Sequence, residues 1–193
     1  TYTHDFVELF NRGSSNVNLA GWSIQYTSAT GTGNFGSSTT LITELSGTLA
    51  PGQYMLVQEA SNAAVGAALP TPDITDASPI AMAAGGGKVA LVNTTTPLGC
   101  NGNANTCSAA ALATIVDLVG YGNANYFEGT GATPTPSATA SVVRKANGCT
   151  ETDNNNSDFE LDTAPFTPRN TSSTLNVCGG GDTAPSVTST SPA

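Results

Sequence analysis

The residues with the clearest potential for chemistry lie in one acidic stretch, CTETDNNNSDFELD, at residues 149–162. Asp153, Asn155, Asp158 and Glu160 offer oxygen ligands within this short segment, and calcium takes about six to eight oxygens. The spacing is not that of an EF-hand, because the glycine and the terminal glutamate of that loop are missing. We therefore expect either a calcium site here, the cation following from the hard oxygen ligands, or a solvated asparagine-rich turn.

No set of residues in the sequence predicts catalysis. His4 is the only histidine, and it stands beside Asp5 near the start of the chain without a nucleophile partner. The glycine-rich stretch at residues 31–38 lacks the lysine of a phosphate-binding loop, and no G-x-S-x-G motif is present. We expect that the chain is not an enzyme and that it needs no cofactor other than calcium.

Aromatic residues leave sugar binding open as a further interpretation. Tyr121, Tyr126 and Phe127 lie in or near a Gly/Asn loop, where exposed rings could stack on a sugar. Packing in the interior is the favoured alternative, above all for Trp22 and Tyr54, which occupy alternating strand positions. Contact with a polysaccharide or a cell surface therefore stays undecided.

The composition is that of an exported β-protein. Only 10% of the 193 residues are charged and 38% are hydrophobic, so uncharged polar residues replace the usual charged surface. The net charge of −9 disfavours direct binding of nucleic acid. No run of apolar residues is long enough to span a membrane, and Asp117 interrupts the longest one, at residues 109–122.

The cysteines predict two disulfides. Cys100 and Cys107 enclose a short polar loop, and Cys149 and Cys178 flank the acidic stretch. A zinc site is disfavoured, because the spacing is wrong and histidines are lacking. In the chain-entropy description the second bridge stabilises the fold by roughly 3–4 kcal/mol. Paired cysteines predict an oxidising location, extracellular or at the cell surface.

Strand signals recur along the chain with Gly, Pro and Asn turns between them, which predicts an all-β sandwich. One short helix is expected at residues 61–70, from Ser61 as N-cap to Pro70 as stop. The basic residues Arg144, Lys145 and Arg169 are expected to pair with the acidic stretch. Strands are predicted at residues 5–10, 19–28, 39–45, 53–60, 88–93, 114–122 and 139–146.

The chain divides into a sandwich domain, residues 1–178, and a tail, residues 179–193. The tail begins with three glycines, which predict a hinge, and continues as APSVTSTSP, a polar but β-prone sequence. Two interpretations stay open for it. In the first, the tail is a free strand that is able to reach another molecule. In the second, it is the start of a further immunoglobulin-like repeat.

An ordered series of segments resembles the lamin-tail-like domain family, and more closely its bacterial secreted branch. The series is DFVELFNRG, NLAGWSIQY, LAPGQYMLVQEA, KVALVN, IVDLVGYG and VVRKANGCTETDNNNSDFE, in this order between about residues 5 and 172. The resemblance implies an immunoglobulin-like β-sandwich without a shared catalytic centre. It also implies a place as an accessory module beside secreted nucleases or phosphatases, or in surface proteins.

Family members usually carry one more strand before DFVELF, and it is missing here, which predicts an open sheet edge beside residues 5–10. We expect a non-catalytic secreted protein that assembles with copies of itself when a tail adds to this edge, as a filament or surface-layer subunit. The alternative is an accessory module of a larger secreted enzyme such as an extracellular nuclease. The expected assembly residues are Phe6, Val7, Leu9, Phe10, Pro185, Val187 and Ser189.

Overall fold

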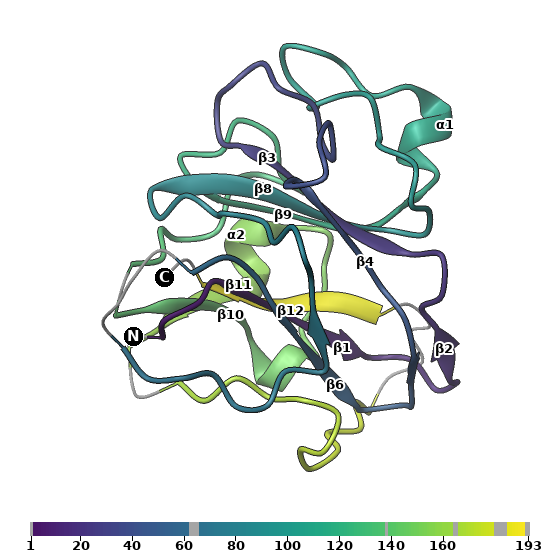
Figure 1. Ribbon diagram of the computed structural model, residues 1–193, viewed down its shortest axis with the longest axis vertical. Coiled ribbons are helices and arrows are strands. Elements are labelled where there is room, and N and C mark those ends of the chain that lie inside the picture. Colours follow the sequence, from purple (N-terminus) through teal and green to yellow (C-terminus); the bar gives the residue numbers. More distant parts are fainter. Residues whose placement is uncertain (1, 62–65, 138, 164–165, 180–184, 192–193) are drawn as a thin grey trace.

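The computed structural model describes residues 2–61, 66–137, 139–163, 166–179 and 185–191, and these form two β-sheets packed face to face (Figure 1). The larger sheet has the strand order β11-β10-β12-β1-β6-β7. Its strands are β1 (Phe6–Asn11), β6 (Tyr54–Gln58), β7 (Ile74–Thr75), β10 (Ser141–Arg144), β11 (Phe159–Asp162) and β12 (Pro185–Ser191). All neighbours are antiparallel except β6 and β7.

The smaller sheet has the order β4-β3-β8-β9, and two further strands form a separate ribbon. The bounds are β3 (Ser23–Ser28), β4 (Ile42–Glu44), β8 (Gly86–Val92) and β9 (Ile115–Gly122), with β2 (Val17–Asn18) and β5 (Thr48–Leu49) in the ribbon. The helical turns are α1 (Ala109–Leu112), η1 (Ala146–Gly148) and α2 (Asn155–Asp158). The predicted all-β sandwich is thus confirmed.

The core lies between the sheets because alternate residues of each strand point inward. Val7 and Leu9 of β1 meet Ile24 of β3 and Val89 and Leu91 of β8 in one buried cluster. The other face of β8 is covered as well, since a second cluster forms beneath the chain segment that contains the first disulfide. This explains why every residue of β8 is buried and why its second half, Val89–Val92, is apolar on both faces.

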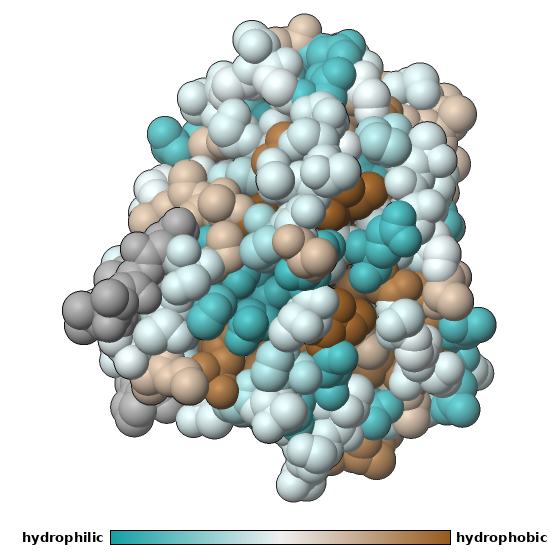
Figure 2. Space-filling view, viewed as in Figure 1, coloured by the Kyte–Doolittle hydropathy of each residue, from teal (hydrophilic) through white to brown (hydrophobic). Residues whose placement is uncertain are grey.

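The outer face of the larger sheet is covered by the chain segment that follows β11. Phe166 stacks on Phe6 with ring centroids 6.0 Å apart, and the Arg169 guanidinium lies 3.9 Å above the Tyr54 ring. Arg169 also forms an ion pair of 2.7 Å with the fully buried Glu8. Figure 2 shows hydrophobic residues on the visible face only as small patches between polar ones.

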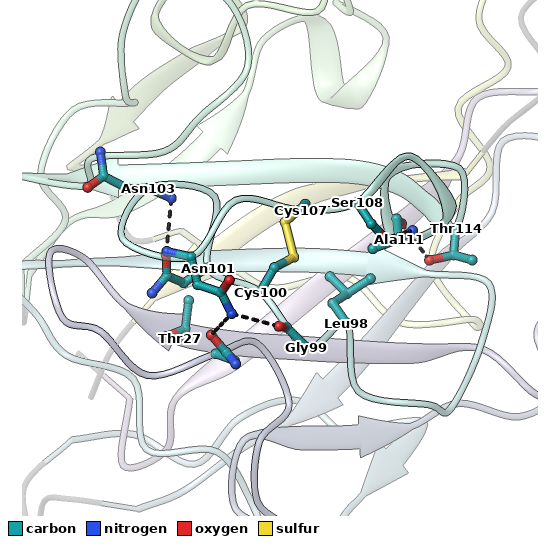
Figure 3. Close-up of a disulfide and its surroundings, with 12 residues drawn as sticks. Thr27, Leu98, Gly99, Cys100, Asn101, Asn103, Cys107, Ser108, Ala111 and Thr114 are labelled. Carbon is teal, nitrogen blue, oxygen red and sulfur yellow. Dashed lines mark hydrogen bonds between the residues drawn. A yellow bond between two sulfur atoms is a disulfide. The ribbon is translucent and has the colours of Figure 1, made fainter.

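Both predicted disulfides are present. Cys100 and Cys107 close a tight polar loop beside α1, where the Ser108 hydroxyl accepts a hydrogen bond from the Ala111 amide, 3.2 Å away (Figure 3). Cys149 and Cys178 join the end of η1 to the covering segment. The second bridge therefore fastens the outer cover to the larger sheet.

Several predicted boundaries need correction. The helix expected at residues 61–70 lies partly outside the described residues, since 62–65 are not described, and residues 66–70 are not helical. The strand expected at 19–28 begins only at Ser23, because Gly21 has a φ of 84° and turns the chain. The helical turns among the described residues have three or four residues each, so none of them can cross a membrane.

The predicted open edge beside β1 is not open. β1 lies in the interior of the larger sheet, with β6 on one side and β12 on the other. The strand that covers it is the chain's own tail, which Figure 1 shows in yellow beside β1. Unpaired backbone groups of a sheet edge take up an added strand readily, and here residues 185–191 satisfy them.

Candidate assembly site

The site is the space between β1 and β10 that β12 fills, and we call it the strand slot. β12 runs antiparallel to both neighbours, with six paired positions along β1 and two along β10. All seven residues of β12 are buried, since β9 of the smaller sheet and η1 pack against the strand between its two neighbours. An extended segment of mostly serine and threonine thus occupies an interior position of the sheet.

The structure brings the predicted assembly residues together within one chain. Val187 lies opposite Leu9, and Ser189 lies opposite Glu8. The remaining pairs are Phe6 with Ser191, Val7 with Thr190, Phe10 with Ser186, and Asn11 with Pro185. The residue pattern therefore identified the two segments that meet, although it placed the contact between copies.

Thr190 is the clearest case of a polar residue in an apolar layer. It lies opposite Val7 on one side and Val142 on the other, and both valines belong to the main core cluster. Only one position of β12, Val187, contributes a side chain to that cluster. The layer between the sheets is therefore less apolar along β12 than along β1.

A β-bulge interrupts β12 at Thr188. Glu8 pairs with Ser189 and the next residue of β1, Leu9, pairs with Val187, so Thr188 is the extra residue. Two side chains from outside the strand bind the backbone at this point. The Val187 N–H donates to Asp117 Oδ2 at 2.6 Å, and the Val187 carbonyl accepts from Arg144 Nε at 3.1 Å.

We call Asp117 and Arg144 the peptide clamp. Asp117 comes from β9 of the smaller sheet and Arg144 from the end of β10, so the clamp also links the two sheets. Arg144 Nη2 donates to both Asp117 oxygens, at 2.8 and 3.0 Å. Because the clamp binds only N–H and C=O groups of the strand, it holds β12 without reading its side chains.

The clamp is embedded in carboxylates. Buried Arg144 also forms ion pairs with Glu151 and, at 3.7 Å, with Asp158, and its guanidinium lies 4.4 Å from the Phe159 ring centre. The predicted pairing of Arg144 with the acidic stretch is thus confirmed, whereas Arg169 pairs with Glu8 instead.

Titration of the neighbouring carboxyl groups reflects this crowding. Burial, and then the negative charges of Asp117 and Glu151, raise the pKa of Glu128 to about 8. Burial also raises the pKa of Glu151 against the attraction of Arg144. The single positive charge of Arg144 does not balance all the carboxyl groups buried around it, which favours the protonated form of some of them.

Four hydroxyl groups of β12 find no hydrogen-bond partner among the described residues. They are the side-chain oxygens of Ser186, Thr188, Ser189 and Thr190, all fully enclosed. A buried hydroxyl without a partner costs free energy, because it has given up its hydrogen bonds to water. The strand that fills the slot is therefore well paired through its backbone and poorly matched through its side chains.

The residues of the predicted calcium site serve other purposes. The Asn155 amide bridges β9 and Glu128: its oxygen accepts from the Gly120 N–H at 2.8 Å, and its nitrogen donates to the Leu118 carbonyl and, at 3.3 Å, to the Glu128 carboxylate. Asp158 accepts hydrogen bonds from the Thr152 N–H and hydroxyl at 2.8 and 2.6 Å.

The other two predicted ligands, Asp153 and Glu160, are exposed, and Glu160 lies on β11. Within the described ranges no group of three or more His, Cys, Asp or Glu residues is placed to hold a metal ion. Calcium binding therefore stays a prediction from the sequence, without an assembled ligand set to support it.

Of the aromatic residues weighed for sugar binding, Tyr121 is buried, whereas Tyr126 and Phe127 are half-buried. Tyr121 is fully buried in the main core, where its hydroxyl donates to the Ala83 carbonyl at 3.0 Å. Tyr126 packs against the second apolar cluster. The packing interpretation is thus confirmed for Tyr121, whereas Tyr126 packs on the cluster with part of its side chain exposed.

The fold and the slot define the class of protein: an immunoglobulin-like β-sandwich whose larger sheet is completed by a strand from far along the chain. Comparison with protein families identifies the family within this class: the lamin tail domain model matches residues 1–123. The chain belongs to the lamin tail domain family, and its immunoglobulin-like fold agrees with the two sheets described above. Neither curated proteins nor solved structures gave a significant match.

Proposed function

We propose that this chain is a non-catalytic structural protein that assembles with copies of itself by exchange of β12. In the assembly, residues 185–191 of one copy occupy the strand slot of the next. The observation that carries the proposal is that the sheet is completed by a segment from the end of the chain, held through backbone pairs and the peptide clamp.

The contacts of β12 are the same whether the strand comes from its own chain or from a copy. Exchange therefore costs little in contact energy, and the balance depends on the linker and on protein concentration. The linker sequence includes three successive glycines, Gly179–Gly181, a composition typical of flexible connections. Head-to-tail exchange that does not close into a ring produces an open filament.

An extracellular location fits this role. The two disulfides are compatible with secretion, since such bonds persist in oxidising compartments. We place the chain in the bacterial secreted branch of its family, as a subunit of an extracellular filament or a surface layer. Its partners on this proposal are copies of itself, without direct contact to nucleic acid.

A second candidate function is that of an accessory or spacer module in a larger secreted enzyme such as an extracellular nuclease. The observation that favours it is the pairing of β12 with β1 of its own chain. A sheet completed in this way gives a self-contained domain, which needs no second copy to cover its edge.

Sedimentation velocity combined with negative-stain electron microscopy separates the two candidates. The full chain is compared with the variant Val187→Pro, which removes the N–H that binds Asp117. Self-assembly predicts oligomers or filaments that grow with concentration and are lost in the variant. A monomer at all concentrations, with or without calcium, would reject self-assembly and favour the accessory module.

A further inference from the structure

The strand slot and its present occupant are poorly matched, and this mismatch points to a different occupant. Ser186, Thr188, Ser189 and Thr190 are each at most 1% exposed and have hydroxyls without a partner among the described residues. A strand with aliphatic side chains at some of these positions would avoid that cost and fill the same volume.

The surroundings of Thr190 show which kind of side chain fits best at this position of the strand. It lies between Val7 and Val142 in the layer that faces the smaller sheet. Valine has nearly the same shape as threonine and carries a methyl group in place of the hydroxyl, so it fits here without a change in packing. β-branched residues are also favoured in strands.

The bulge residue, Thr188, has an apolar neighbour on its outer side. An added side-chain carbon on Gly148 would meet both the Phe10 ring and the Thr188 hydroxyl, at 2.6 and 2.8 Å. This hydroxyl thus lies close to an aromatic ring and to backbone without a hydrogen bond. An aliphatic residue would suit this position as well.

Charge distinguishes the position of Ser186 from the other three. A pocket at the beginning of β12 is lined by Ser186 together with four acidic residues and one arginine. Burial first, and then the negative charges of Asp117 and Glu151, raise the pKa of Glu128 to about 8, so carboxylates crowd this end of the slot. A basic side chain in this pocket would offset that surplus. The acidic lining residues are Asp117, Glu128, Glu151 and Asp153.

Backbone recognition leaves the choice of side chains free. The peptide clamp binds only the Val187 N–H and carbonyl, and β1 and β10 add backbone pairs. Any extended segment that presents an N–H and a C=O at this point satisfies the same groups. Side-chain fit then decides between competing segments.

We propose that the strand slot is a binding site for an extended segment of a partner protein, with aliphatic residues at the positions of Thr188 and Thr190 and a lysine or arginine at that of Ser186. This segment displaces β12. The proposal rests on the slot accepting a strand from another molecule, as the proposed function does, but it names an occupant other than β12 of a second copy.

The test measures fluorescence anisotropy of labelled seven-residue peptides with the unaltered full chain. One peptide has the sequence of residues 185–191, and a second carries Ser186→Lys, Thr188→Val and Thr190→Val. A third adds Val187→Pro to the second, which removes the N–H that the clamp binds. Each peptide is incubated to equilibrium, because β12 must leave first.

We expect the second peptide to bind saturably and at least about tenfold more tightly than the first, because it loses two unpaired hydroxyls and gains a charge pair. The third peptide should show no saturable binding. Hydrogen exchange should show loss of amide protection in β12 when the second peptide is bound. High salt should weaken the second peptide more than the same peptide with Ser186 retained.

Equal binding of the second and third peptides, or no binding of either, would overturn the proposal. Slow release of β12 is excluded as the cause by repeating the measurement with the full-chain variant Val187→Pro, whose own tail is loosened, after its melting curve has confirmed that it is folded. Binding of the second peptide by a chain that stays monomeric would support this proposal while rejecting self-assembly, so that the two can fail separately.

Discussion

β1 and β12 lie side by side in one sheet and differ in nearly every respect that makes a strand stable. β1 places Val7 and Leu9 in the core, and its one buried charge, Glu8, is paired with Arg169. β12 places Val187 in the core and encloses four hydroxyls without partners among the described residues. Backbone pairing and burial are shared by both strands, so the two strands differ mainly in side-chain fit.

The largest expected effect tests this difference in stability. Leu9→Ala should lower the free energy of unfolding by about 3 kcal/mol, since it empties a fully buried position. Val187→Ala should cost no more than about 1 kcal/mol, although Val187 is equally buried, because the proposed exchange requires β12 to leave the sheet without unfolding the domain. Urea unfolding of both variants measures the two costs, and equal costs would contradict the account.

The next effect is the pH dependence of stability, and it compares a buried glutamate beside β6 with one near the peptide clamp. Burial raises the pKa of Glu59, next to β6, to about 7, and that of Glu128, near the clamp, to about 8, both from 4.5. The folded state therefore binds extra protons above pH 4.5. The stabilisation is fully present below that pH and is lost as pH rises through about 7 and 8.

Glu59→Gln imitates the protonated side chain, so it should flatten this loss. We expect it to match the unaltered chain near pH 4.5 and to be more stable at pH 9 by on the order of 2 kcal/mol. Urea unfolding across this range measures the effect. A variant that is less stable than the unaltered chain at pH 9 would show that the folded state stabilises the ionised Glu59 carboxylate instead of penalising it.

The smallest effect has an unusual sign. Thr190→Val should stabilise the chain by about 1 kcal/mol, because it removes an unpaired buried hydroxyl. Thr43→Val is the matched control: its hydroxyl donates to Glu59 at 2.9 Å, so the same substitution should destabilise. If thermal unfolding shows that both variants lose stability, the hydroxyl of Thr190 has a partner that the account lacks.

Local patterns in the sequence were sufficient to predict most strands. Alternation put Ile24 and Tyr26 of β3 on one face and separated Met55 and Val57 of β6 from Tyr54 and Leu56, and the structure shows that the first two pairs face the main cluster. The cysteine pairing also followed from spacing and from the flanking composition. These features depend on neighbours that are close in sequence or on residue type alone.

The site depended on contacts that local patterns do not encode. The apolar pattern shows Asp117 only as an interruption of an apolar run. A charge at the centre of a buried strand also indicates a buried partner, and the sequence does not say which residue that partner is. Its partner Arg144 is 27 residues away in sequence and Val187 is 70 residues away. Polar β12 carried no hydrophobic alternation that would have marked it as an interior strand.

Mixing two singly substituted chains tests the exchange of β12 most directly. One chain carries Val7→Cys and the other Thr190→Cys, positions that lie opposite each other in the sheet. Exchange predicts a disulfide between the two different chains, visible as a reducible dimer, and its yield should rise with concentration. A chain that carries both substitutions and forms only an internal disulfide, together with no dimer in the mixture, would contradict exchange and leave β12 as a fixed strand of its own domain.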